Sequence, residues 1–337
     1  MRSMKILAAS LLGVATLTAA TAASAAAIIT NGTITLGVDD SGQLNPRSPL
    51  GTPSPVTGTR IVGLRFNETG NEATSHGCLC EGWGVGIGGT AIGGFANNDD
   101  TGAAGVGLTP VSFTSTATTA TSVVRVGSSL EVTHAFAPAM ETPNLYRVTV
   151  SITNTSGADI ANLLYRRTFD WDVEPTTFSE FVTIGGTAAA TAVTAANNNG
   201  FCSSSVFAGC APIGAANTGD FTDVGAFDHG SNFDFNFGAL ADGATFTFEI
   251  FYGAALTERG ALGALAAVGA EVFSLGQCSR DREGTGAGGC NTFAFGFRGV
   301  GGRPIDPDPI PVPAALPLFL AGLGGFGALR RMKKKAA

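Results

Sequence analysis

Apolar and polar residues alternate strictly in the middle of this 337-residue chain. Tyr146, Val148, Val150 and Ile152 are apolar, and each is followed by a polar residue. A period of two places these apolar side chains on one face of a β-strand, whereas an amphipathic helix repeats every three to four residues. The segment is therefore predicted to be a strand with one buried face.

The same pattern recurs along the chain, with turn residues between the runs. Residues 127–129 are predicted to join a strand at 123–126 to one at 130–136, and Ala241-Asp242-Gly243 has the chemistry of a hairpin turn. The pattern predicts an all-β fold for residues 26–303, an antiparallel β-sandwich built as one large unit or in two parts. Further strands are expected at residues 160–173, 233–237, 246–252, 272–275 and 292–297.

Two kinds of segment depart from the strand pattern. Residues 257–269 are predicted to form one short helix with Thr257 as its N-cap, packed across one end of the sandwich. The glycine-rich stretches at 82–94 and 102–107 lack the Lys-Ser/Thr pair of a phosphate-binding loop, and we expect surface loops and bulges there.

The N-terminal 25 residues have the organisation of a secretion signal. Arg2 and Lys5 precede an apolar stretch at 6–17, and Ala23-Ser24-Ala25 supplies the small residues that signal peptidase accepts. Residues 1–25 are therefore predicted to be a signal peptide that signal peptidase removes after Ala25.

The C-terminal residues have the organisation of a membrane tail. Residues 304–313 contain closely spaced prolines, which favour an extended spacer. Residues 314–329 carry no charge and are predicted to form a transmembrane helix within a tail at 314–337. The basic cluster that follows should stay on the cytoplasmic side, which leaves residues 26–303 outside. It consists of Arg330, Arg331, Lys333, Lys334 and Lys335.

A short motif joins the spacer to the apolar helix. Ile310, Pro311, Val312, Pro313 and Ala314, followed by the apolar helix and the basic end, resemble the PEP-CTERM sorting tails of bacteria, in their Val-Pro-Leu-Pro-Ala variant. The resemblance covers only about the last thirty residues. It implies transient insertion into the inner membrane, processing by an exosortase-like enzyme, and delivery to the envelope or surface of a Gram-negative bacterium, often beside exopolysaccharide.

The charged residues between the two ends are mostly acidic. All four lysines lie in the signal or the tail. Removing two positive charges in the signal and five in the tail from the formal charge of −7 leaves −14 for the remainder. Because phosphate contacts come mainly from lysine and arginine, we expect no nucleic-acid partner. Lysine-based nucleophile or Schiff-base chemistry is also excluded from residues 26–303.

Six cysteines occur in the exported part, as three pairs that are close in sequence, and disulfide bonds are expected on the oxidising side of the membrane. The Cys78–Cys80 pair also leaves other readings open: a redox site, bonds to other cysteines, or a metal site with His76. The candidate disulfide cysteines are Cys78, Cys80, Cys202, Cys210, Cys278 and Cys290.

The richest polar run lies within the strand predicted at 160–173 and just after it. Alternation places Asp170, Asp172 and Glu174 on one face and Trp171 on the other. Three neighbouring carboxylates repel unless arginines across the sheet or a Ca²⁺ ion compensate, and a glycosidase-like acid pair is a third interpretation.

No hydrolase signature accompanies these residues, so we expect neither catalysis nor a required cofactor, with Ca²⁺ as the one candidate ion. The sequence predicts a non-catalytic protein of the cell envelope or extracellular matrix. The alternative is a carbohydrate-binding or carbohydrate-active sandwich that uses Trp171, with Trp83 as a second candidate. Burial of Trp171 discriminates between the two, because a sugar platform needs an exposed aromatic side chain.

Overall fold

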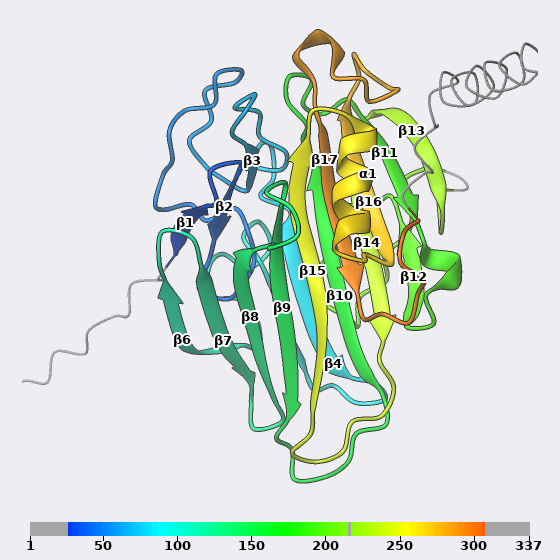
Figure 1. Ribbon diagram of the computed structural model, residues 1–337. Coiled ribbons are helices and arrows are strands. Elements are labelled where there is room, and N and C mark those ends of the chain that lie inside the picture. The colour runs from blue at the N-terminus through cyan, green and yellow to red at the C-terminus, as the bar shows by residue number, and fades with distance from the viewer. Residues whose placement is uncertain (1–25, 215–216, 307–337) are drawn as a thin grey trace, which may run out of the picture.

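The computed structural model describes residues 26–214 and 217–306 (Figure 1). The predicted signal peptide at 1–25, the sorting motif and the tail at 314–337 lie outside the described residues, as does most of the proline-rich spacer. Within the described part, no helix is long and apolar enough to cross a membrane.

The larger sheet has nine antiparallel strands. Its central strands, β15 and β9, pair along nine residues, and the alternation seen in sequence places Val148, Val150 and Ile152 in the core. In spatial order the strands are β13 (Phe221–Phe227), β11 (Glu180–Gly185), β16 (Val272–Cys278), β17 (Thr292–Arg298), β15 (Thr245–Ala255), β9 (Leu145–Asn154), β8 (Leu130–Pro138), β7 (Ala120–Val126) and β6 (Thr109–Ser115).

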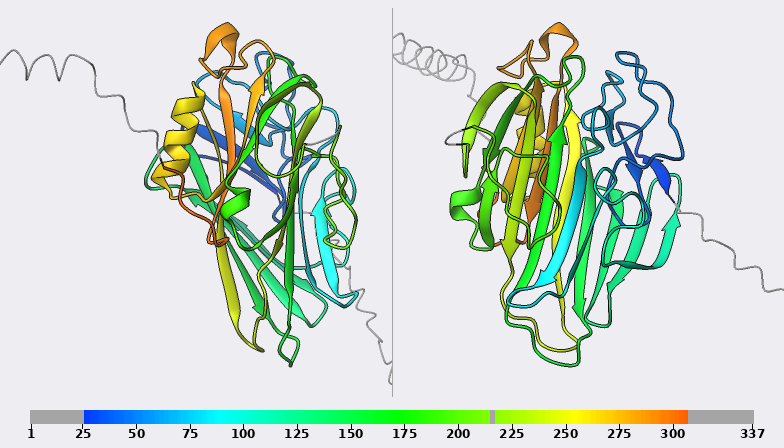
Figure 2. Two further views of the ribbon diagram at one scale, coloured as in Figure 1. Left: turned by 90° about the vertical axis from the view of Figure 1, so that its right-hand side faces the viewer. Right: turned by 180° about the vertical axis from the view of Figure 1, so that it is seen from behind.

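A second antiparallel sheet of five strands lies against the first, and the two layers are seen edge-on at the left of Figure 2. Phe169 of this sheet lies 5.2 Å from Phe295 of β17, centroid to centroid, so aromatic side chains of both sheets share one core. In spatial order the strands are β12 (Val193–Asn197), β14 (His229–Asn236), β10 (Leu163–Trp171), β4 (Glu81–Ile87) and β5 (Gly93–Asn97).

The remaining elements are small. A three-stranded sheet near the N-terminus contributes to the same core. Together with the two large sheets it gives a mostly β, antiparallel, sandwich-like body, which confirms the predicted fold class at that level. The strands are β1 (Ala27–Thr30), β2 (Ile34–Val38) and β3 (Leu64–Phe66), and the 3₁₀ turns are η1 (Thr187–Ala189) and η2 (Ala287–Gly289).

The predicted helix is present as α1 (Glu258–Ala267), and the Thr257 hydroxyl accepts a hydrogen bond from the Gly260 amide as its N-cap. Its predicted position across one end of the sandwich is wrong. Leu265 of α1 packs on β15 and β17, against residues such as Phe251 that point away from the main core. The helix therefore covers the outer face of the nine-stranded sheet (Figure 2, left).

Two local predictions need correction. The turn at 241–243 does not close a hairpin, because β14 belongs to the five-stranded sheet and β15 to the nine-stranded sheet. Residues 82–94 are not mainly surface loop, since they contain the buried strand β4 and the start of β5. A Cβ at Gly84 would lie 2.0 Å from the Ser204 carbonyl oxygen, so the glycines of β4 let a covering loop approach the strand closely.

The predicted pairing about residues 127–129 is confirmed. β7 and β8 form a tight antiparallel pair in which Val126 is opposite Leu130. Val124, Val126 and Leu130 all point into the main core. Local alternation joined by a short polar turn was sufficient to define this hairpin.

Candidate functional site

Four acidic residues, three of them buried, gather where β10 and β13 end and where β11 and β14 begin. Asp170 lies near the end of β10, opposite Gly230 of β14, and Asp172 follows the strand. Asp228 lies at the junction of β13 and β14. Glu180 begins β11 and is paired with Phe227, the residue before Asp228. The sheet registers thus bring four carboxylates together from three separate parts of the sequence.

Three of these residues form a compact oxygen cluster. One carboxylate oxygen from each of Asp170, Asp172 and Asp228 lies within 4.8 Å of the others. Asp170, Asp172 and Glu180 are fully buried, whereas Asp228 is exposed. The cluster therefore extends from the protein surface into the interior.

The buried carboxylates have no side-chain hydrogen-bond donors among the described residues. Both oxygens of Asp172, both oxygens of Glu180 and Oδ1 of Asp170 lack a partner. Oδ2 of Asp170 lies 3.3 Å from Sγ of Cys78, but this sulfur is bonded to Cys80 and carries no hydrogen to donate. Six buried carboxylate oxygens are consequently left without a side-chain donor among the described residues, although most buried polar atoms in proteins have a partner. Only the backbone amides of His76, near Asp172, and of Ser179 and Val173, near Glu180, oppose the effect of burial, and they do so in part.

The surroundings of these carboxyl groups disfavour their charged forms. Burial, followed by the charges of Glu180 and Asp228, raises the pKa of Asp172 to about 9. Burial raises the pKa of Glu180 to about 9, and Asp170 and Asp228 add to the effect; the nearby amides of Ser179 and Val173 only partly oppose it. Burial and the charge of Asp172 likewise raise the pKa of Asp170 well above its usual range. Every charged neighbour that shifts these pKa values is itself acidic.

His229, the residue after Asp228, does not compensate this charge. His229 starts β14 and is buried. Burial lowers its pKa to about 4, so it is neutral at pH 7. Its Nδ1 lies 3.2 Å from the Asn198 amide nitrogen and its Nε2 lies 3.3 Å from the Glu180 carbonyl oxygen. Both ring nitrogens are therefore occupied by other partners.

Glu174 does not join the cluster, although the alternation grouped it with Asp170 and Asp172. β10 ends at Trp171, so the alternation does not extend to Glu174. The Glu174 carboxylate accepts hydrogen bonds from the Ser54 hydroxyl at 2.7 Å, the Thr57 hydroxyl and the Glu72 amide at 2.8 Å. Burial would raise its pKa, but these bonds and the contact with His76 outweigh burial and lower the pKa to about 2.

Both tryptophans are fully buried in the main core. The Trp171 indole N–H donates to Oγ of Ser274 at 3.0 Å, and that of Trp83 donates to the Ser41 carbonyl oxygen at 2.8 Å. Neither ring is exposed for stacking on a sugar, so the carbohydrate alternative lacks the platform that the sequence suggested.

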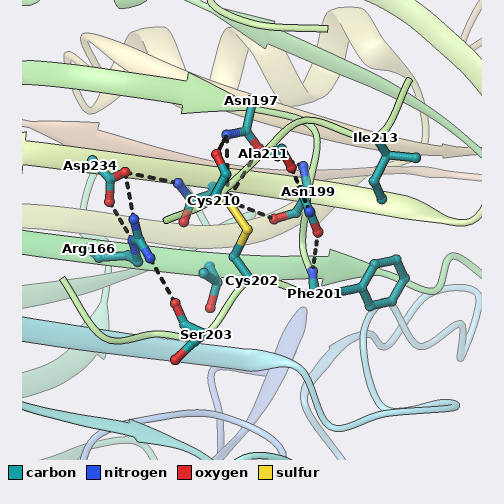
Figure 3. The surroundings of a disulfide bond; sticks show 12 residues. Arg166, Asn197, Asn199, Phe201, Cys202, Ser203, Cys210, Ala211, Ile213 and Asp234 are labelled. Atoms are coloured by element: carbon teal, nitrogen blue, oxygen red, sulfur yellow. Dashed lines mark hydrogen bonds and ion pairs between the residues drawn. A yellow bond between two sulfur atoms is a disulfide. The ribbon is translucent and has the colours of Figure 1, made fainter. Parts of the chain in front are cut away.

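All six cysteines form the disulfides expected from their proximity: Cys78–Cys80, Cys202–Cys210 and Cys278–Cys290. The first of these leaves no thiolate for a metal site with His76. The second closes a loop over the outer face of the five-stranded sheet, where Arg166 bonds to Asp234 and to the Ser203 carbonyl oxygen (Figure 3).

The five-stranded sheet contains a buried ion pair, on its face toward the nine-stranded sheet, that was not expected from the sequence. Arg167 on β10 and Glu81 at the start of β4 are both inaccessible to solvent, and Nε of Arg167 lies 2.6 Å from Oε1 of Glu81. The Tyr252 hydroxyl and the Leu44 amide also donate to the Glu81 carboxylate. The sequence signal for this pair is the position of Arg167 on the apolar face of its strand, because a buried arginine requires an acidic partner.

No known protein-family model matches the chain, and no curated protein matches it. The fold and these side chains therefore define the class by themselves: a disulfide-linked, antiparallel, sandwich-like β protein with an unneutralised carboxylate cluster at one end.

Proposed function

We propose that the chain is a non-catalytic protein of the bacterial cell envelope or extracellular matrix. Signal peptidase removes residues 1–25, the tail enters the inner membrane transiently, and an exosortase-like enzyme processes it near Pro311 and Pro313. The protein then resides at the surface of a Gram-negative cell, with exopolysaccharide as its partner.

The pairing of all six cysteines is the observation that carries this proposal. Disulfide bonds persist in oxidising compartments and are rare in the reducing cytosol. The burial of both tryptophans and the lack of lysine in residues 26–303 further favour a structural role over a catalytic one.

Expression of the full chain in a host with and without its exosortase tests the sorting step. We expect the surface form to end near residue 313 when the exosortase is present, and the intact, membrane-retained chain to accumulate when it is absent. C-terminal mass spectrometry and cell fractionation measure both outcomes. An intact tail in both hosts would contradict exosortase sorting.

A further inference from the structure

We propose that Asp170, Asp172 and Asp228 bind one Ca²⁺ ion, with Glu180 supplying a fourth negative charge beside it. Ca²⁺ binds oxygen ligands at about 2.3–2.6 Å, so two ligands on opposite sides of one ion lie at most about 5.2 Å apart. The three aspartate oxygens lie within 4.8 Å of one another, which fits one shared ion.

Glu180 supports a bound cation independently of the three aspartates. It is fully buried, belongs to a different strand, and has no side-chain donor for either carboxylate oxygen among the described residues. Its strand pairs with β13 at Phe227, the residue before Asp228, which places Glu180 beside the cluster. Because burying an uncompensated carboxylate is costly, a group of this kind must be neutralised by protons or by a cation.

Within residues 26–214 and 217–306, no arginine or histidine forms an ion pair with these four carboxylates. Residues 26–303 contain no lysine, and the nitrogens of His229 are already bonded elsewhere. By contrast, Asp234 on the neighbouring β14 strand is paired with Arg166, with Nη2 and Oδ2 2.9 Å apart. Asp234 and Glu81 of the five-stranded sheet thus each have an arginine partner, whereas the cluster has none among the described residues.

The chemistry of the ligands selects the ion. A set made only of carboxylates suits hard cations such as Ca²⁺ and Mg²⁺, whereas Zn²⁺ and copper prefer nitrogen and sulfur. Mg²⁺ requires near-octahedral ligands at about 2.0–2.1 Å, which restricts opposite oxygens to about 4.2 Å. Ca²⁺ accepts more numerous and more irregularly placed oxygen ligands, which suits carboxylates that come from the end of one strand and the junction of two others.

The position of the cluster gives the ion a path and a structural role. Asp228 is exposed, so an ion can enter from solvent and keep water ligands on that side. Asp170 belongs to the five-stranded sheet, and Asp228 lies at the crossing from the nine-stranded sheet to the five-stranded one. A bound ion would therefore tie the two sheets together at this end of the molecule.

The direct test uses the full purified protein, freed of metal with a chelator, and Ca²⁺ alone as the probe. Extracellular Ca²⁺ modules bind with Kd of about 10⁻⁴–10⁻³ M. The expected Kd range rests on the proposed export of the protein. The Ca²⁺ site itself does not, because binding is measured on the purified protein whether or not the protein is sorted. Calorimetry should give one ion per chain, and 10 mM Ca²⁺ should raise Tm by about 3–10 °C, with a smaller rise in Mg²⁺.

Two variants locate the site. Asp172→Asn removes a buried ligand at constant size, and Asp228→Asn removes the exposed ligand, where folding is least at risk. Each should weaken Ca²⁺ binding at least tenfold and remove most of the Tm rise. Asp242→Asn, at an exposed acid in the connection between β14 and β15, is the matched control and should bind Ca²⁺ like the wild type.

Tb³⁺, which takes the same oxygen ligands, provides a second readout through emission sensitised by the neighbouring Trp171. We expect Ca²⁺ to displace this emission competitively. The proposal is overturned by the absence of saturable Ca²⁺ binding up to 10 mM in the wild type, or by equal binding in the wild type and both site variants.

Discussion

At the scale of single residues, the Glu81–Arg167 pair shows how a charge is accommodated inside a β-sandwich. Burial lowers the pKa of Arg167, but the adjacent Glu81 carboxylate more than reverses this and keeps the guanidinium charged. The Tyr252 hydroxyl and the Leu44 amide also donate hydrogen bonds to the Glu81 carboxylate, so both of its oxygens have donors. Buried pairs with satisfied hydrogen bonds depend on both partners, since either one alone is an unpaired charge.

We therefore expect Glu81→Gln to lower the free energy of unfolding by about 3–5 kcal/mol, because Arg167 keeps its charge without a counterion. Urea titration at pH 7 measures the change. The control, Glu131→Gln, breaks the solvent-exposed pair with Arg125 and should change stability by about 1 kcal/mol or less. Equal losses in the two variants would contradict the importance of burial.

Glu174 is a second residue whose role can be tested, here by pH. Its pKa of about 2 lies below the usual value near 4.5, so the ionised form stabilises the folded state. That contribution is complete above about pH 4.5 and disappears as the pH falls towards 2. Glu174→Gln should therefore lower stability by up to about 3 kcal/mol at pH 7. Urea titrations between pH 7 and 3 should show the wild type and the variant converging, and a constant difference would contradict this.

At the scale of elements, the strand β4 explains why a glycine-rich sequence can be buried. A side chain at Gly84 would collide with the Ser204 backbone in the loop that the Cys202–Cys210 disulfide closes. The glycine pattern thus reflects a covering loop and not an exposed one. A glycine-rich sequence does not distinguish a buried strand beneath a covering loop from an exposed loop. The strand needs glycine so that another backbone can approach closely, and the loop needs glycine for its conformational freedom.

Gly84→Ala should accordingly lower the free energy of unfolding by about 1–3 kcal/mol, because the added methyl group must displace the covering loop. Gly263→Ala on α1 is the matched control, since nothing lies within 4 Å of its added Cβ and alanine favours helix. It should raise stability by up to about 1 kcal/mol. Thermal unfolding of both variants distinguishes steric exclusion from a general effect of replacing glycine.

At the scale of the whole molecule, the distribution of lysine gives a simple test of processing. Residues 26–303 contain no lysine, and the tail contains Lys333, Lys334 and Lys335. A protein that has lost both its signal and its tail should therefore take up a single amine-reactive label, at its new N-terminal amino group.

Intact-mass analysis after exhaustive labelling with an N-hydroxysuccinimide ester provides the measurement. A chain that keeps its tail should carry four labels, one at the N-terminus and three on lysines. The control is the chain from the exosortase-deficient host, which has lost its signal peptide and keeps its tail. Four labels on the surface form would contradict removal of the tail.

The sequence by itself predicted the antiparallel β class, the β7–β8 hairpin, the capped helix and the three cysteine pairs. Each depends on neighbours in the chain: alternation of side chains, a polar turn, a hydroxyl three residues before an amide, or two nearby thiols. It also drew attention to Asp170 and Asp172, because three acids within five residues of a strand need compensation.

Only the tertiary structure decided which acids belong together. Asp228 and Glu180 join the cluster because β11 pairs with β13 and β14 pairs with β10. Glu174 is not part of it because β10 ends before that residue. The burial of Trp171, the partner of Arg167 and the assignment of β14 and β15 to different sheets depend on the same long-range pairing. Local periodicity defines which face a side chain occupies, whereas the packing of distant strands determines what that face meets.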